Sequence, residues 1–200
     1  MSVLVGGSAC DFWSAAVMPD NTIEDSFNFR KYVNESIGVL FFYPLDFTFV
    51  CPSEIIALNN KLEEFEKRNA KVIVVSVDSQ FTHLAYKNTP VDKGGIGCVK
   101  FPMVSDLTKG ISTSYGVLHD NSMALRGTFI IDDTFTVRHQ LINDFPFGRN
   151  IEEILRIVDA IIFNKKHGEV CPANWKSGTA GMKATTEGVA EYLRDNASEL

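Results

Sequence analysis

The sequence has no long hydrophobic segment. Its longest apolar runs, such as residues 39–43, reach about five residues, far fewer than the roughly 20 that a membrane-spanning helix needs. No lysine or arginine precedes the short apolar segment at the N-terminus, which makes that segment a poor signal or transit peptide. We therefore expect a cytoplasmic protein that has no part in a membrane.

The sequence also has fewer basic than acidic residues. The chain carries 19 Lys and Arg against 25 Asp and Glu, for a formal net charge of −6 at pH 7. This balance argues against nucleic acid or an anionic membrane surface as the main partner. The 45% hydrophobic content over 200 residues is that of an ordinary globular protein with a real core.

Cysteine is scarce and irregularly placed, at positions 10, 51, 98 and 171. This spacing is no disulfide framework and suits a reducing compartment. No second ligand stands two to four residues from Cys171, so it is no zinc site, and we expect neither metal nor cofactor. Cys10 and Cys98 have no setting that suggests chemistry, and we interpret both as structural or incidental.

The pattern of apolar residues predicts an α/β protein. Strand, helix, strand and helix follow one another, which is typical of βαβ units in a sheet with a parallel centre. A hairpin is expected before them, a polar connection at 31–36, and a second hairpin at the sheet edge after them. The expected strands are 12–17, 25–29, 37–43, 71–77, 101–104, 128–131 and 135–141, and the expected helices start at Pro52 and span 79–89, 151–163 and 185–195.

Two details of this prediction can be tested directly. In the helix 79–89 we expect Phe81, Leu84 and Ala85 to face the core. After residue 164 the apolar period is lost, so we divide the chain into a catalytic domain, 1–164, and a C-terminal arm, 165–200.

Cys51 is the main candidate for chemistry. It stands beside Pro52 at the start of a predicted helix, where unpaired backbone N–H groups and the helix dipole favour its thiolate form. Thr48 can place a hydroxyl beside the sulfur, and Pro44 keeps the preceding loop from becoming helix. The alternative is that Cys51 is only a small buried hydrophobic residue.

Two arginines are further candidates. Arg126 directly precedes a predicted buried strand, where a guanidinium could pair with a thiolate or stabilise a departing oxygen. Arg149, before the long helix, is a weaker version of the same idea. The alternative for Arg126 is that it is an ordinary surface arginine. A Cys-His protease dyad has no local signature here.

Four segments together resemble the typical two-cysteine, AhpC-like subgroup of the peroxiredoxins. PLDFTFVCP at 44–52 resembles their peroxidatic motif, and ALRGTFIID at 124–132 resembles the segment with their active-site arginine. GEVCPANW at 168–175 resembles their resolving-cysteine segment, and GGIG at 94–97 resembles an element linked to over-oxidation. The similarity runs from about Phe12 to about Asp195.

The resemblance implies a thioredoxin-like fold, with a central mixed β-sheet flanked by helices, an N-terminal hairpin and a C-terminal arm. It implies a thiol peroxidase in which Cys51 attacks hydrogen peroxide or an organic hydroperoxide and becomes a sulfenic acid, which condenses with Cys171 of another subunit. Thr48, Arg126 and Pro44 would shape the site, with support from Glu54 and Arg149. Thioredoxin or a similar dithiol protein would be the reductant, and homodimers would assemble into decamers.

A helix start and an arm are improbable places for two sulfurs in disulfide geometry, which requires Cα atoms within about 7 Å. We therefore expect the first turn after Cys51 to unwind and the arm to move during the reaction.

Three departures from the family pattern matter. Ser53 stands where Thr is usual, Ile96 where Leu is usual, and Leu193 follows Tyr192 where Phe is usual. In the family the last two elements pack over the site and slow its unwinding. Because the Phe ring is lost, we expect over-oxidation to be present but reduced.

Two competing functions are open. A general disulfide oxidoreductase would share the fold, but the chain has no Cys-x-x-Cys. A chaperone-like binding ring is a different class, and a Cys51→Ser variant separates it from a peroxidase.

Overall fold

The computed structural model describes residues 3–199. By contacts between residues the chain forms two compact units, one ending at Ile151 and one starting at Glu152, and each is described by itself. This division falls earlier in the chain than the predicted one after residue 164. The boundary at residue 164 between a catalytic domain and an arm stays a prediction.

The first unit is built on a seven-stranded mixed sheet of order β2-β1-β5-β4-β3-β8-β9. Its centre is parallel, because β3 pairs in parallel with β4 and β4 with β5, while β8 and the N-terminal hairpin pair antiparallel. The strands are β1 (Trp13–Val17), β2 (Ile23–Asn28), β3 (Ile37–Phe42), β4 (Ala70–Ser76), β5 (Met103–Ser105), β8 (Arg126–Ile131) and β9 (Val137–Asn143), and a separate small pair is formed by β6 (Leu118–His119) and β7 (Met123–Ala124).

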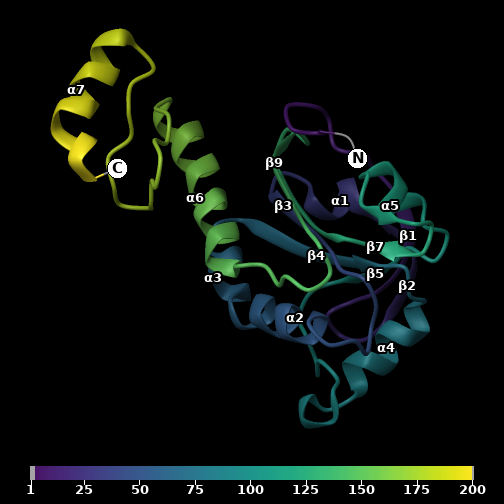
Figure 1. Cartoon of the computed structure of the whole chain (residues 1–200). Coiled ribbons are helices and arrows are strands. Elements are labelled where there is room, and N and C mark those ends of the chain that lie inside the picture. The colour runs from purple at the N-terminus through teal and green to yellow at the C-terminus, as the bar shows by residue number, and fades with distance from the viewer. Residues whose placement is uncertain (1–2, 200) are drawn as a thin grey trace. The chain divides into compact units, whose positions relative to one another are not determined.

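Helices cover both faces of this sheet (Figure 1). Gly38 of β3 faces α1, where a Cβ atom would lie 3.1 Å from a Val33 methyl carbon, so this face allows a close approach of the helix. The opposite face carries the two crossover connections, with α3 packed on β4 and α4 on β5. The helices of this unit are α1 (Phe29–Val33), α2 (Cys51–Asn60), α3 (Leu62–Glu66), α4 (Gln80–Asn88) and α5 (Gly110–Ser114), with a 3-10 turn at Val91–Lys93.

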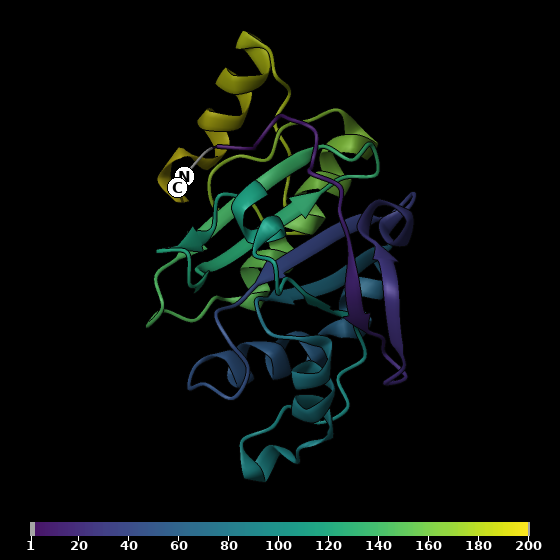
Figure 2. The same ribbon diagram turned by 90° about the vertical axis from the view of Figure 1, so that its right-hand side faces the viewer.

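The central strands are buried on both sides, as their continuous apolar sequences predict. Every residue of β3 and of β8 is buried, which is typical of strands covered by helices on both faces. Strand β9 lies at the sheet edge and pairs antiparallel with β8, which confirms the predicted second hairpin. Figure 2, turned by 90°, shows the strands of this unit side by side.

Two local predictions are wrong. Residues 31–36 are not simply a polar connection, because Asn28 accepts a hydrogen bond from Lys31 N and starts α1. The core face of α4 is also not the predicted one: Phe81 and Ala85 are exposed and Leu84 is half-buried. The buried residues of α4 are His83, Tyr86 and Lys87. The polar groups of two of them have partners elsewhere in the fold, His83 in Asp46 and Lys87 in Met18 O.

The second unit contains most of α6 (Ile151–His167), then an irregular segment, α7 (Thr186–Asn196) and a 3-10 turn at Ala197–Glu199. Helix α7 starts at Thr185, whose hydroxyl accepts a hydrogen bond from Gly188 N. Both helices confirm the predictions made from the 3.6-residue period, although α6 continues to His167. No helix among residues 3–199 is long and apolar enough to cross a membrane.

Candidate active site

Cys51 is the first residue of α2 and is fully buried. Strand β3 ends at Phe42, and a loop of irregular backbone carries the chain over the sheet to the helix. Pro52 occupies the first turn, where its missing N–H costs no helical hydrogen bond. Ser53 keeps a hydroxyl where it donates to Val50 O at 2.6 Å, within the same turn. The predicted position of the thiol at a helix start is therefore confirmed.

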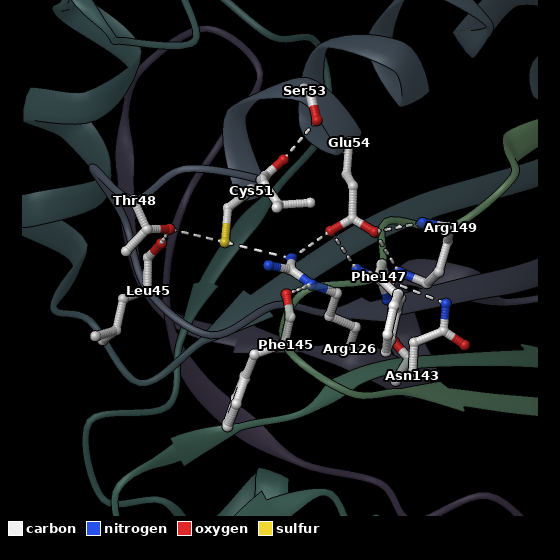
Figure 3. A network of polar contacts seen from close by, with 12 residues as sticks. Leu45, Thr48, Cys51, Ser53, Glu54, Arg126, Asn143, Phe145, Phe147 and Arg149 are labelled. Atoms are coloured by element: carbon white, nitrogen blue, oxygen red, sulfur yellow. Dashed lines mark hydrogen bonds and ion pairs between the residues drawn. The ribbon is translucent and has the colours of Figure 1, made fainter.

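The Thr48 hydroxyl lies beside this sulfur, as Figure 3 shows. Its Oγ1 is 2.9 Å from Cys51 Sγ and 2.8 Å from Leu45 O. Because a hydroxyl has one proton, Thr48 donates to one of these acceptors at a time. Pro44, buried before this loop, fixes its backbone φ and supplies no N–H.

Arg126 reaches the sulfur from β8, of which it is the first residue. Its Nη1 lies 3.5 Å from Cys51 Sγ and 2.6 Å from Glu54 Oε2, and its Nε donates to Phe145 O at 2.7 Å. The side chain is buried, so it is not the surface arginine of the alternative interpretation. The fold thus brings a cation and a hydroxyl to one buried thiol.

Glu54 lies between Arg126 and Arg149 (Figure 3). Its Oε1 accepts from Arg149 N and Nε, both at 2.8 Å, and its Oε2 accepts from Arg149 Nη2 at 3.1 Å. Arg149 also donates to Gly127 O at 2.7 Å, and its guanidinium lies 3.2 Å from the ring centroid of Phe41. Two buried cations and one buried carboxylate therefore form one hydrogen-bonded group next to the sulfur.

Burial is the dominant influence on the pKa of Arg149. It lowers the pKa of Arg149 to about 10, against the opposing effect of the Glu54 carboxylate. The side chain stays charged at neutral pH because Glu54 pairs with it. Sequence reasoning ranked this arginine below Arg126, and only the folded arrangement shows that both bind the same carboxylate.

A second polar group that sequence reasoning missed braces the loop before Cys51. The Asp46 carboxylate accepts from Tyr43 Oη at 2.6 Å and lies 2.8 Å from His83 Nδ1, and all three residues are buried. Asp46 N donates to Asp78 at 2.9 Å. Burial and the Asp46 charge raise the pKa of Tyr43 well above its ordinary value. The presence of Asp46 in an apolar loop was the one signal in the sequence.

Cys171 belongs to the second unit and is half-buried there. Its Sγ donates to Ala160 O of α6 at 3.6 Å, and the surrounding loop is closed by reciprocal hydrogen bonds between Val170 and Met182. Burial raises the pKa of the Cys171 thiol, while the charge of Arg156 opposes that effect. Cys171 is therefore held as a neutral thiol in this arrangement.

Residues 3–199 contain no group of three or more His, Cys, Asp or Glu side chains that could hold a metal ion.

Comparison with known proteins identifies the family. The model of the AhpC/TSA family matches residues 5–140, which is more than half of the chain. The chain belongs to this family. A second model, described as the C-terminal domain of 1-Cys peroxiredoxin, matches residues 160–194 and includes Cys171.

Relatives of this peroxiredoxin cover nearly its whole length. Alkyl hydroperoxide reductase C of Helicobacter pylori (strain ATCC 700392 / 26695) is 52% identical over 198 residues, 99% of this chain and 100% of the relative. Peroxiredoxin-1 of Gallus gallus is 49% identical over 190 residues, 94% of each chain. A reduced 2-Cys peroxiredoxin of Plasmodium vivax has a TM-score of 0.94 and 49% identity, and covers 96% of this chain and 100% of its own.

These findings confirm the thioredoxin-like fold and the class of activity. The protein is an oxidoreductase of the peroxiredoxin type, which reduces peroxides as an antioxidant. The roles of its individual residues rest on the geometry.

Proposed function

We propose that Cys51 is the peroxidatic nucleophile of this enzyme and that Cys171 is its resolving cysteine. The observation that carries the first role is the convergence of the Thr48 hydroxyl, at 2.9 Å, and Arg126 Nη1, at 3.5 Å, on the Cys51 sulfur. No purely structural cysteine requires a buried cation and a hydroxyl at its sulfur. A nucleophile that generates an oxyanion requires both.

The first step oxidises the sulfur. The Cys51 thiolate attacks one peroxide oxygen, an S–O bond forms, and the O–O bond breaks. The electron pair goes to the second oxygen, which takes up a proton and leaves as water or an alcohol. Acidity of the thiol alone does not make this step fast, because nucleophilicity falls as the thiol becomes more acidic. Donors fixed around the breaking bond, from Thr48 and Arg126, supply the remaining acceleration.

Glu54 and Arg149 act through Arg126. Of four hydrogen bonds that the Glu54 carboxylate accepts, three come from guanidinium nitrogens of Arg126 and Arg149 and one from the Arg149 backbone. They hold the carboxylate in one orientation, and it in turn fixes Arg126 beside the sulfur. Pro44 shapes the loop that carries Thr48. These three residues are positioning residues in this proposal.

The second step forms a disulfide. Cys171 Sγ attacks the sulfenic sulfur of Cys51, an S–S bond forms, and the sulfenic oxygen leaves as water with the thiol proton. Cys51 is fully buried in the first turn of a regular helix, so that turn has to unwind before a second sulfur reaches it. Crystal structures of the dithiol and disulfide forms with identical loops at Cys51 would contradict this step.

The assembly and the reductant belong to the same proposal. The disulfide joins two subunits, a dithiol protein such as thioredoxin reduces it, and homodimers assemble into decamers. Large exposed apolar side chains in the loop before Cys51, those of Phe47 and Phe49, and on α4, that of Phe81, support burial against another copy. A cytoplasmic location stays a prediction.

A non-reducing gel after one equivalent of peroxide tests the mechanism. We expect a covalent dimer with the unaltered chain and none with Cys51→Ser or Cys171→Ser. Cys51→Ser should also abolish peroxide consumption. Retained consumption by Cys51→Ser would remove the proposed nucleophile, and a dimer band that persists in Cys171→Ser would remove the proposed partner.

A further inference from the structure

The proton of the buried Tyr86 hydroxyl has no acceptor among residues 3–199. The residue lies on the core face of α4 and is fully buried, yet its Oη has no hydrogen-bond partner among residues 3–199. Leaving a buried hydroxyl unpaired costs free energy, and most buried hydroxyls therefore have a partner. A phenylalanine would fill the same space without that cost. The hydroxyl therefore needs an explanation outside packing.

The surroundings of Tyr86 fix it beside the Cys51 loop. Its ring packs against the ring of Phe47, with centroids 4.6 Å apart, and Phe47 directly precedes Thr48 in that loop. On the other side Ile96 N donates to Tyr86 O at 3.3 Å, so the glycine-rich loop holds the backbone. The first contact limits the orientations of the ring, and the second fixes the backbone that carries it.

Tyr86 approaches the site from a different direction than Arg126. In the sheet, β3 is flanked by β8 on one side and by β4 on the other. Arg126 comes from β8, while Tyr86 comes from α4, which follows β4. Tyr86 therefore belongs to the β4 side of β3, whereas Arg126 belongs to the β8 side.

Burial, with help from nearby negative charge, keeps this hydroxyl protonated. Burial chiefly, and then negative charge at Asp46 and Cys51, raise the pKa of Tyr86 above its ordinary value, against the opposing effect of the Phe47 backbone N–H. The hydroxyl is therefore neutral over the whole range in which Cys51 reacts, and it offers a proton to hydrogen-bond rather than a negative charge.

We propose that the Tyr86 hydroxyl is a further hydrogen-bond donor of the peroxidase site, and that its acceptor is an oxygen of the bound hydroperoxide. This inference rests on the proposed role of Cys51. The bonds that form and break are those of the oxidation step given above, and Tyr86 transfers no proton in it. Negative charge grows on the leaving oxygen as the O–O bond stretches, so an interaction that is unmade in the free enzyme strengthens in the transition state and raises the rate.

A pair of matched variants tests this role. Tyr86→Phe removes only the unpaired hydroxyl, whereas Tyr115→Phe removes an equally buried hydroxyl that donates to Cys10 O at 2.8 Å, away from the site. The measurement is the single-turnover rate of Cys51 oxidation by hydrogen peroxide and by cumene hydroperoxide, followed by competition with a haem peroxidase. Thermal unfolding is recorded for each reduced protein.

We expect opposite behaviour of the two variants. Tyr86→Phe should oxidise about tenfold more slowly with both peroxides, which is what a loss of one hydrogen bond in the transition state predicts, while its unfolding midpoint stays the same or rises. Tyr115→Phe should keep the oxidation rate and unfold at a lower temperature. An unchanged rate in Tyr86→Phe would overturn the inference, and an unchanged rate with an altered oligomeric state would assign the hydroxyl to a subunit contact instead. Failure of the proposed function can be distinguished from failure of this inference, because in that case Cys51→Ser would still consume peroxide.

Discussion

One nitrogen of Arg126 lies 2.6 Å from Glu54 Oε2, and the same nitrogen lies 3.5 Å from the Cys51 sulfur. The Glu54 carboxylate therefore orients the Arg126 guanidinium, so that the nitrogen it binds also faces the Cys51 sulfur. Arg149 closes the arrangement by binding both oxygens of Glu54. Both arginines and Glu54 are buried, so each charge depends on the others for compensation.

We predict that Glu54→Gln lowers both stability and activity. The substitution leaves two guanidinium groups buried without a counter-charge, which costs about 3 kcal/mol of unfolding free energy or more. Arg126 also loses the oxygen that orients it, so Cys51 oxidation should slow. Urea denaturation and the single-turnover oxidation rate measure the two effects. Glu64→Gln is the matched control, since Glu64 pairs with Lys67 on an exposed helix surface and should change stability by less than about 1 kcal/mol. Equal stability of Glu54→Gln and Glu64→Gln would contradict the prediction.

We expect the Thr48 hydroxyl to speed the oxidation of Cys51 by donating a hydrogen bond. We expect Thr48→Val to slow the oxidation of Cys51 about a hundredfold, because one preorganised donor to a developing oxyanion is lost. Thr48→Ser keeps the hydroxyl and should stay within a few-fold of the unaltered enzyme. Stopped-flow measurement with hydrogen peroxide separates the two variants. Similar losses in both would mean that Thr48 contributes through its methyl group and packing.

Sequence reasoning identified the parts of the site that local pattern determines. Cys51 at the start of a helix follows from an apolar strand, a proline and a helical period, and Arg126 at the start of β8 follows from a buried apolar run. The partners of Glu54 could not be predicted, because Arg126 and Arg149 reach it across 72 and 95 positions of sequence.

The core face of α4 also could not be predicted from the sequence pattern. Hydrophobicity favours Phe81 as the buried residue, but Phe81 is exposed and His83 and Lys87 are buried. His83 is compensated by Asp46, and Lys87 donates to Met18 O at 2.7 Å. These partners come from distant segments, so periodicity alone selects the wrong face.

Lys87 should give the stability of the protein a distinctive dependence on pH. Burial lowers its pKa in the folded protein to about 8, against 10.5 for an ordinary lysine. Between these values the unfolded chain binds a proton that the folded one has lost, so unfolding takes up a proton. The contribution of Lys87 to stability therefore rises with pH across this window and falls as pH drops through 8.

The difference between variants isolates this contribution. We expect Lys87→Met to lack the rise, which reaches at most about 1.4 kcal/mol per pH unit, whereas Lys87→Arg keeps a charge throughout and should be the less stable of the two. Urea denaturation between pH 7.5 and 10 provides the curves. Cys171, whose pKa is raised, contributes an opposite slope that is common to all variants and cancels in the differences. Parallel curves for the unaltered chain and Lys87→Met would disprove the assignment.

Leu193 offers a test of over-oxidation. It lies exposed on α7, directly after Tyr192, where the family pattern has an aromatic ring. A larger ring buries more apolar area when α7 packs on a neighbouring surface, and packing that slows unwinding at Cys51 lengthens the life of the sulfenic acid. We therefore expect Leu193→Phe to form sulfinic acid at lower peroxide concentrations than the unaltered chain, as measured by mass spectrometry of the Cys51 peptide during turnover. Val189→Phe adds a ring at another exposed position of the same helix, one turn earlier, and should leave the sulfinic acid yield unchanged. Equal yields from the unaltered chain and Leu193→Phe would show that residue 193 does not control the lifetime of the intermediate.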